Sequence, residues 1–220
     1  MRGDFSLEYF LITLIVIICS ISLHEFGHAI SADRLGDPGP RRDGRVTLWP
    51  DRHFDPIGFI MILLTTYFGF GIGWGKPVLV NPDRFRHPRR DLLIVAAFGP
   101  LMNLLLALAA GGLLRVGLLT QSPLLLADES YVFKFAFAFL TINLSLMFFN
   151  LLPLHPLDGG KILSSLLPER TAEQYDRVMW QWGPLILMIA VMSGSGILGT
   201  LIGPAVRQSA AWILGLPGAA

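Results

Sequence analysis

Residues 5–32 read FSLEYFLITLIVIICSISLHEFGHAISA, a long apolar run that ends in a cluster of ionisable side chains. About 20 apolar residues suffice for a helix to cross the roughly 30 Å hydrocarbon layer of a bilayer. The run continues directly into His24, Glu25 and His28, and no small-residue cleavage site precedes them. The pattern therefore predicts a retained first transmembrane helix rather than a removable signal peptide.

The composition of the whole chain agrees with a membrane protein. Of its 220 residues, 53% are hydrophobic and only 15% are charged, whereas soluble domains carry about 25% charged residues. Most soluble classes and disorder are therefore excluded, and a net charge of +1 excludes nucleic-acid binding through a basic face. The single Cys19 excludes an intramolecular disulfide framework. We expect one transmembrane domain over residues 1–220, with a core at about 5–165 and additional carboxy-terminal spans at about 178–216.

Further apolar runs follow the first. Residues 92–119 and 131–152 are clear candidates for transmembrane helices, while the runs 178–192 and 197–216 are shorter or interrupted by Gly and Pro. Residues 56–75 are also apolar, but they end in an alternation of Gly with large residues that is unfavourable for a helix. The expected fold class is an all-α polytopic membrane protein, with about five to six transmembrane helices and a re-entrant segment at 56–75.

Two short runs between the spans have β-like composition. They are RVTLW at 45–49 and PVLVN at 77–81, and Pro or Gly bounds both of them. We expect these runs to pair as a small β-sheet at the membrane surface.

The string His24-Glu25-Phe26-Gly27-His28 carries the chemistry of the first span. Residues four apart lie on one face of a helix, so the two imidazoles can hold one metal ion, and Glu25 can take a proton from metal-bound water. Ionisable groups within a span are costly and functional by default. The alternative is a polar helix face that lines a cavity, with both histidines hydrogen-bonded to neighbouring groups.

A catalytic zinc site needs a third protein ligand. Asp158 stands out among the remaining candidates because it lies in NLLPLHPLDGG, at 150–160, directly after a strong span. Prolines break the helix there, glycines free the backbone, and irregular backbone at membrane depth has to line a cavity or the protein interior. The alternative for Asp158 is a helix N-cap for residues 159–167, which does not exclude metal ligation.

These motifs together resemble the site-2 protease family of intramembrane zinc metalloproteases, in a compact form without a PDZ or CBS domain. The family's second motif, N-x-x-P-x-x-P-L-D-G, is matched by residues 150–159, and Phe98-Gly99-Pro100-Leu101-Met102-Asn103 is similar to a third family string, with Phe98 in place of the usual Ala. The strings Gly-Arg-Val-Thr-Leu and Gly-Lys-Pro-Val between the spans also match. The resemblance covers residues from about 20 to about 165.

The resemblance implies a role for each site residue. It implies one zinc ion per chain, with His24, His28 and Asp158 as ligands and Glu25 as general base and acid. It also suggests that Asn150 helps to hold the substrate strand or the oxyanion, the alternative being an interhelical hydrogen bond. Asn103 is expected to be structural, and His53 and His155 receive no role from the resemblance.

The implied activity is that of a zinc metalloendopeptidase, which hydrolyses peptide bonds within or near the transmembrane segments of membrane-tethered proteins. Its partners would be single-span membrane proteins and the lipid bilayer, with no nucleic acid, and no pattern indicates an oligomeric state. A rival from another class is a non-proteolytic zinc-binding membrane protein, such as a transporter or a metal sensor. A structural scaffold with an inactive site is a third reading, which the complete set of motifs disfavours.

The zinc ligands also constrain the topology. His28 lies near the end of its span and Asp158 lies just past the 131–152 span, so both ends must face one side, which requires that residues 56–75 do not cross. The basic loops 33–55 and 76–91 are then both cytoplasmic. We expect an outside amino terminus and zinc nearer the cytoplasmic face. Fourteen Arg against three Lys suggest a GC-rich prokaryotic genome, and the expected location is a cell membrane, the prokaryotic inner membrane.

Overall fold

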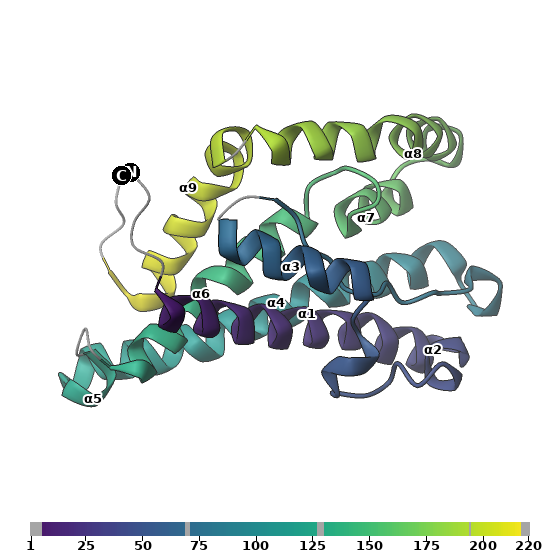
Figure 1. Ribbon diagram of the computed structural model, residues 1–220. Helices are drawn as coiled ribbons and strands as arrows, with labels where there is room; N and C mark the ends of the chain where they lie inside the picture. Colours follow the sequence, from purple (N-terminus) through teal and green to yellow (C-terminus); the bar gives the residue numbers. More distant parts are fainter. Residues whose placement is uncertain (1–5, 69–70, 127–129, 194, 217–220) are drawn as a thin grey trace.

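Three long helices form the centre of the molecule. The computed structural model describes residues 6–68, 71–126, 130–193 and 195–216. Within them, α1 (Leu7–Leu35), α4 (Pro88–Thr120) and α6 (Tyr131–Asn150) run side by side, with α4 packed against both of the others (Figure 1). The buried residues between α4 and α6 include Ala107, Leu114, Leu140 and Leu144. This bundle is the frame on which the candidate site is built.

The remaining elements lie at the ends and along the flank of the bundle (Figure 1). The short α2 (Gly39–Arg42) and α5 (Pro123–Leu126) lie at opposite ends, and α3 (Pro56–Phe68) packs against α1. Beyond α6 come α7 (Asp158–Leu166), α8 (Glu169–Met192) and α9 (Ser195–Leu214). Two 3-10 turns, η1 (Pro50–Arg52) and η2 (Pro82–Arg84), begin at prolines.

Local sequence signals set the ends of the long helices. The Ser6 side chain accepts a hydrogen bond from the Tyr9 amide and caps the start of α1, and Gly36 ends it with a φ of 117°. That left-handed conformation favours glycine. Pro88 occupies the first turn of α4, where its missing N–H costs nothing.

Four of the described helices are long and apolar enough to cross a membrane: α1, α4, α6 and residues Gly196–Leu214 of α9. No more than 33% of each apolar window is buried inside the protein, so these helices present apolar side chains outward, as lipid-facing helices do. The fold is that of an all-α membrane protein.

Within the described residues, four helices are long and apolar enough to cross a membrane, fewer than the expected five to six. Residues 178–192 form only the second part of α8, whose first part carries Glu169, Arg170, Glu173, Asp176 and Arg177. An apolar stretch of that length rises only about 22 Å as a helix, less than the roughly 30 Å hydrocarbon layer.

The expected β-sheet does not form. Residues 45–49 and 77–81 contain no strand, and the bridge seen in the described residues joins Phe54 to Gly75 instead. Pro77 has no N–H to donate to a ladder. The carbonyls of Lys76 and Pro77 instead accept hydrogen bonds from the Arg45 guanidinium. A side chain therefore links the two segments in place of backbone pairing.

The residues that flank the segment 56–75 are bridged to each other. Its helix, α3, has 13 residues, and the antiparallel bridge then brings Gly75 back to Phe54. The Lys76 amide donates to the His53 carbonyl over 2.7 Å. Residues 69–70, at the start of the Gly alternation, lie outside the described residues. The two ends of this segment therefore lie beside each other.

Candidate metal centre

Helix α1 brings His24 and His28 together, one turn apart on one face. Both side chains are buried, their rings meet edge-on with centroids 4.7 Å apart, and their Nε2 atoms are separated by 3.1 Å. The period of the helix places both side chains on one face of α1. The pairing of the two histidines expected from the sequence is therefore present in the structure.

Asp158 reaches the same point from α7. One carboxylate oxygen, Oδ2, lies 3.2 Å from His24 Nε2 and 3.1 Å from His28 Nε2, and the other lies 3.4 Å from Lys161 Nζ. Asp158 is the first residue of α7, and Leu157 occupies the N-cap position. The alternative of an N-cap role for Asp158 is therefore wrong, and its carboxylate turns toward the histidines instead.

The three donor atoms have the spacing that a zinc ion requires. Zinc at about 2.0–2.1 Å from its ligands in tetrahedral geometry separates two ligand atoms by about 3.3 Å, and the separations here are 3.1, 3.1 and 3.2 Å. His28 Nδ1 lies 2.8 Å from the Val95 carbonyl, which can only accept, so Nδ1 carries the proton and Nε2 presents a lone pair. His24, His28 and Asp158 are thus a buried group that could hold a metal ion.

Glu25 lies beside His24, His28 and Asp158, which we call the donor group. Its carboxylate is hydrogen-bonded by the segment that follows residues 69–75. Its Oε2 accepts a hydrogen bond from the Val78 amide at 3.2 Å and lies 3.8 Å from an Arg45 nitrogen. The Arg45 side chain is itself buried, and this burial lowers the pKa of its guanidinium below the ordinary value, against the opposing effect of Glu25. The carboxylate of Glu25 therefore has a fixed position next to a buried cation.

A cavity of about 310 Å³ opens onto this group, and His24, Glu25 and Asn150 are among the residues that line it. The Asn150 side-chain nitrogen donates to the Leu146 carbonyl at 3.0 Å, so its oxygen stays available to the cavity. A second cavity of about 280 Å³ adjoins the first, and both are lined by Ile21, Ile72, Gly73, Leu146 and Phe149. A largely apolar path therefore runs along α1 and α6 to the donor group.

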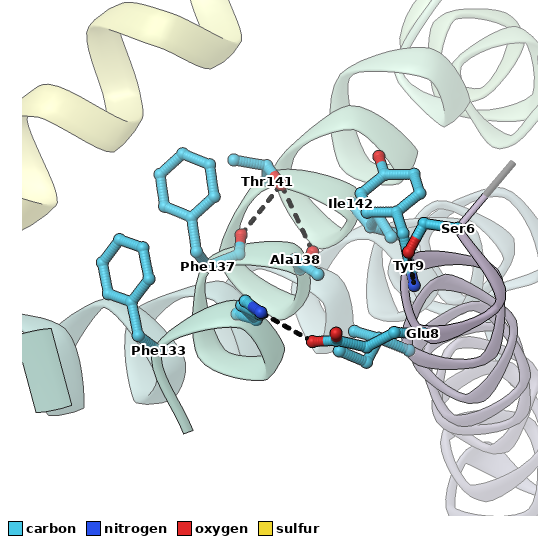
Figure 2. Close-up of a pocket in the computed structure, with 10 residues that line it drawn as sticks. Ser6, Glu8, Tyr9, Phe133, Phe137, Ala138, Thr141 and Ile142 are labelled. Atoms are coloured by element: carbon cyan, nitrogen blue, oxygen red, sulfur yellow. Dashed lines mark hydrogen bonds and ion pairs between the residues drawn. The ribbon is translucent and has the colours of Figure 1, made fainter. Parts of the chain in front are cut away.

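A separate cavity of about 330 Å³ lies far from these residues, between the first turns of α1 and α6 (Figure 2). Figure 2 shows Glu8 in it, whose carboxylate pairs with Lys134 Nζ at 2.8 Å. Glu8 precedes His24 by about 24 Å along α1. This cavity contains none of the residues expected at the site.

His53 and His155 stay apart from the donor group. His53 Nε2 lies 2.8 Å from the Thr47 carbonyl, and His155 Nε2 lies 2.8 Å from an Asp176 oxygen. Within the described residues, neither histidine belongs to a cluster with metal-ligand spacing. This agrees with their omission from the expected ligand set.

Sequence reasoning missed several neighbours of the site. The sequence gives little reason to single out Arg45, which is one of several arginines in a polar loop. It gives more reason to single out Asn143, whose amide lies within an apolar span. No sequence pattern points to the Val95 carbonyl, because the packing of α1 against α4 decides which backbone oxygen lies next to His28.

Comparison with known proteins gives the family. Peptidase family M50 matches residues 120–190. A protein of Bacillus subtilis (strain 168) named as a zinc metalloprotease, YwhC, is 39% identical over 162 residues, covering 74% of this chain and 70% of the relative. Rip2 of Mycolicibacterium smegmatis, also named as a zinc metalloprotease, is 31% identical over 180 residues, covering 80% of this chain and 64% of the relative.

Rip2 of Mycobacterium tuberculosis is 35% identical over 159 residues, and this chain spans 56% of its length. No solved structure matches the chain. The likeness to YwhC extends over most of both proteins. The chain therefore belongs to peptidase family M50, the site-2 protease family of metalloproteases.

Proposed function

We propose that this protein is an intramembrane zinc endopeptidase, in which His24, His28 and Asp158 hold one zinc ion and Glu25 is the general base and acid. The observation that carries the proposal is the convergence of three buried donor atoms at 3.1–3.2 Å, next to Glu25 and open to a cavity. Relatives named as zinc metalloproteases support zinc as the metal.

The chemistry divides between the ion and the chain. A zinc ion held here supplies a Lewis acid that polarises a peptide carbonyl and makes water more acidic. Glu25 takes the proton from the attacking water and later gives it to the leaving amine. The Val78 amide and Arg45 orient its carboxylate for this exchange. Asn150, at the cavity wall, donates or accepts hydrogen bonds with the extended substrate strand.

The depth of the site supports transmembrane segments as substrates. His24 follows the start of α1 by about 26 Å of helix, and the surrounding α1 is one of the apolar helices able to span a membrane. The adjoining cavities present mainly apolar side chains, including Ile17, Ile62 and Leu198. A helical carbonyl is already hydrogen-bonded, so a single-span substrate has to unwind locally before its peptide bond reaches Glu25.

The proposed topology places the site near the cytoplasmic face of a cell membrane. In it, residues 56–75 enter the bilayer and return, since α3 is short and both ends of the segment meet at Phe54 and Gly75. The basic loops before and after this hairpin then share the cytoplasmic side, in line with the positive-inside tendency. The whole chain acts as one transmembrane domain.

Reconstitution of the purified protein with a single-span substrate in vesicles tests the proposal. We expect cleavage inside or beside the span, loss of cleavage after zinc chelation, and recovery when zinc is returned. A non-proteolytic zinc protein, the rival reading, binds zinc and leaves every substrate intact. Cleavage that survives complete chelation with no metal in the protein contradicts the proposed mechanism.

A further inference from the structure

We propose that Asn143 on α6 acts through Asn103 on α4 as a positioning residue for His24, fixing which nitrogen of the His24 ring carries the proton. We call this series of hydrogen bonds, from Asn143 through Asn103 to His24, the relay. It ends at His24 Nδ1 and leaves Nε2 unprotonated, facing His28 and Asp158. The inference rests on the proposed role of His24 as a metal ligand.

The relay starts from a backbone carbonyl, which fixes the orientation of the first amide. The Asn143 side-chain nitrogen donates to the Phe139 carbonyl at 2.8 Å and to Ser20 Oγ at 2.9 Å. A carbonyl oxygen can only accept, so the NH₂ group of Asn143 has to face Phe139. The oxygen of Asn143 is thereby turned toward Asn103.

The second amide passes this orientation on. Asn103 Nδ2 donates to Asn143 Oδ1 at 2.9 Å, and Asn103 Oδ1 lies 2.7 Å from His24 Nδ1. An amide oxygen can only accept, so His24 Nδ1 carries the proton and Nε2 keeps its lone pair. That lone pair points to His28 Nε2 and Asp158 Oδ2, at 3.1 and 3.2 Å.

Burial makes the relay directional. Ser20, Asn103 and Asn143 are each 0% exposed, and they come from α1, α4 and α6. A flipped Asn103 would turn its NH₂ group toward His24 and its oxygen toward the oxygen of Asn143. Such an arrangement leaves buried polar atoms without a partner, and an unpaired buried polar group costs about 1–3 kcal/mol. The network therefore favours one tautomer of His24 before any metal binds.

His28 provides a contrast within the same site. Its Nδ1 proton goes directly to the Val95 carbonyl, which needs no relay because a backbone oxygen cannot flip. A change at Asn143 should therefore affect His24 and leave His28 unchanged. This difference separates a positioning role from a general loosening of the helix bundle.

Nitrogen NMR of metal-free protein labelled at histidine reads the tautomers directly, because protonated and bare ring nitrogens have distinct shifts. We expect His24 of the wild type to be protonated at Nδ1. In Asn143→Leu we expect a mixture of His24 tautomers with His28 unchanged, and a zinc affinity lower by roughly tenfold, within the 10- to 100-fold range for partners of metal ligands.

Two further variants sharpen the comparison. Asn143→Asp is expected to be protonated at this fully buried position, so that its OH donates to the Phe139 carbonyl while its other oxygen accepts from Asn103. This variant should keep the His24 tautomer and most of the zinc affinity. Thr141→Val on the same helix removes only the hydroxyl contacts to the Phe137 and Ala138 carbonyls, at 2.8 and 3.3 Å, and should change neither readout. Equal losses of affinity in Asn143→Asp and Asn143→Leu overturn the relay and indicate a packing role alone.

The wild-type spectrum keeps the test valid even if Asn143→Leu fails to fold. Protonation of wild-type His24 at Nε2 in the metal-free protein overturns the inference without any variant. Failure of the proposed function has a different signature, since a wild type that binds no zinc can still display the Nδ1 tautomer. Zinc binding by the wild type with unchanged affinity in a folded Asn143→Leu protein contradicts the relay alone.

Discussion

Gly99 on α4 lies directly against the imidazole of His28 on α1. A methyl group on its α-carbon would overlap Nε2 of His28, the donor atom itself, and would lie 2.6 Å from Cε1 of His24. No other residue type fits between α4 and the two rings. The donor group is therefore shaped by a helix–helix contact as much as by the spacing of the histidines.

We expect Gly99→Ala to weaken zinc binding by about 10- to 100-fold, because forcing an extra methyl into a packed site costs about 1–3 kcal/mol. Competition titration with a coloured chelator measures this. Gly112→Ala is the matched control on the same helix, since a methyl there meets nothing within 4 Å. Equal zinc affinities of Gly99→Ala and Gly112→Ala would show that the close contact of Gly99 with His28 does not matter for zinc binding.

Asp158→Asn should lower the zinc content of purified protein from near one ion per chain to a small fraction. The amide has the size of the carboxylate but lacks the charge that compensates the ion, and it leaves only two imidazoles as strong ligands. Metal analysis after dialysis measures the loss. Asp33→Asn serves as control, because Asp33 pairs with Arg41 at 2.6 Å outside the donor group.

Arg45→Met should slow cleavage while zinc content stays near that of the wild type. Arg45 is 4% exposed and contacts Glu25 and the Lys76 and Pro77 carbonyls, so its loss leaves the Glu25 carboxylate with the Val78 amide alone and removes one donor from the two carbonyls. A typical hydrogen bond contributes about 0.5–1.5 kcal/mol to stability. Thermal unfolding and turnover are measured together, with the exposed Arg41→Met as control. Normal turnover in Arg45→Met would show that Glu25 needs no such partner.

His53 should make the protein less stable at acidic pH. Burial lowers the pKa of its imidazole below the usual 6.5, against the opposing bond to the Thr47 carbonyl. Because the folded-state pKa is lower than the unfolded one, the stabilisation is complete above about pH 6.5 and is lost as pH falls toward the folded-state pKa.

The unfolding temperature of metal-free wild type and His53→Gln, measured between pH 7.5 and 5, checks this prediction. Glutamine can keep a hydrogen bond to the Thr47 carbonyl but does not titrate. The wild type should lose more stability than the variant as pH falls. Parallel curves would mean that His53 titrates alike in the folded and unfolded chains.

The part of the site that follows from helix period was predictable from the sequence. His24 and His28 had to share a face of α1, and Asp158 stood out as an acid between a span and two glycines. The relay through Asn143 was not predictable, because it depends on the register in which α4 and α6 pack. The sheet expected from residues 45–49 and 77–81 does not form, since Pro77 has no N–H for a ladder and Arg45 takes the carbonyls that a partner strand needs.

Residues 178–192 do not form the expected transmembrane helix, because their apolar stretch is too short to cross a bilayer. In the structure this segment continues from a charged first part of α8, and only α9 of the last two helices is long and apolar enough. Whether residues 178–192 form a separate helix depends on where α8 begins, and helix bounds are hard to predict from sequence.

The most direct test of the proposed mechanism compares the wild type with Glu25→Gln, each loaded with zinc and incubated with one single-span substrate. Products are identified by mass spectrometry, and zinc is measured in the same samples. We predict cleavage within or beside the span by the wild type, and a loss of at least about 10²–10⁴-fold in Glu25→Gln, the range for a general base, with zinc still near one per chain. Undiminished cleavage by zinc-loaded Glu25→Gln, or zinc-loaded wild type that cleaves no membrane-spanning substrate, would contradict it.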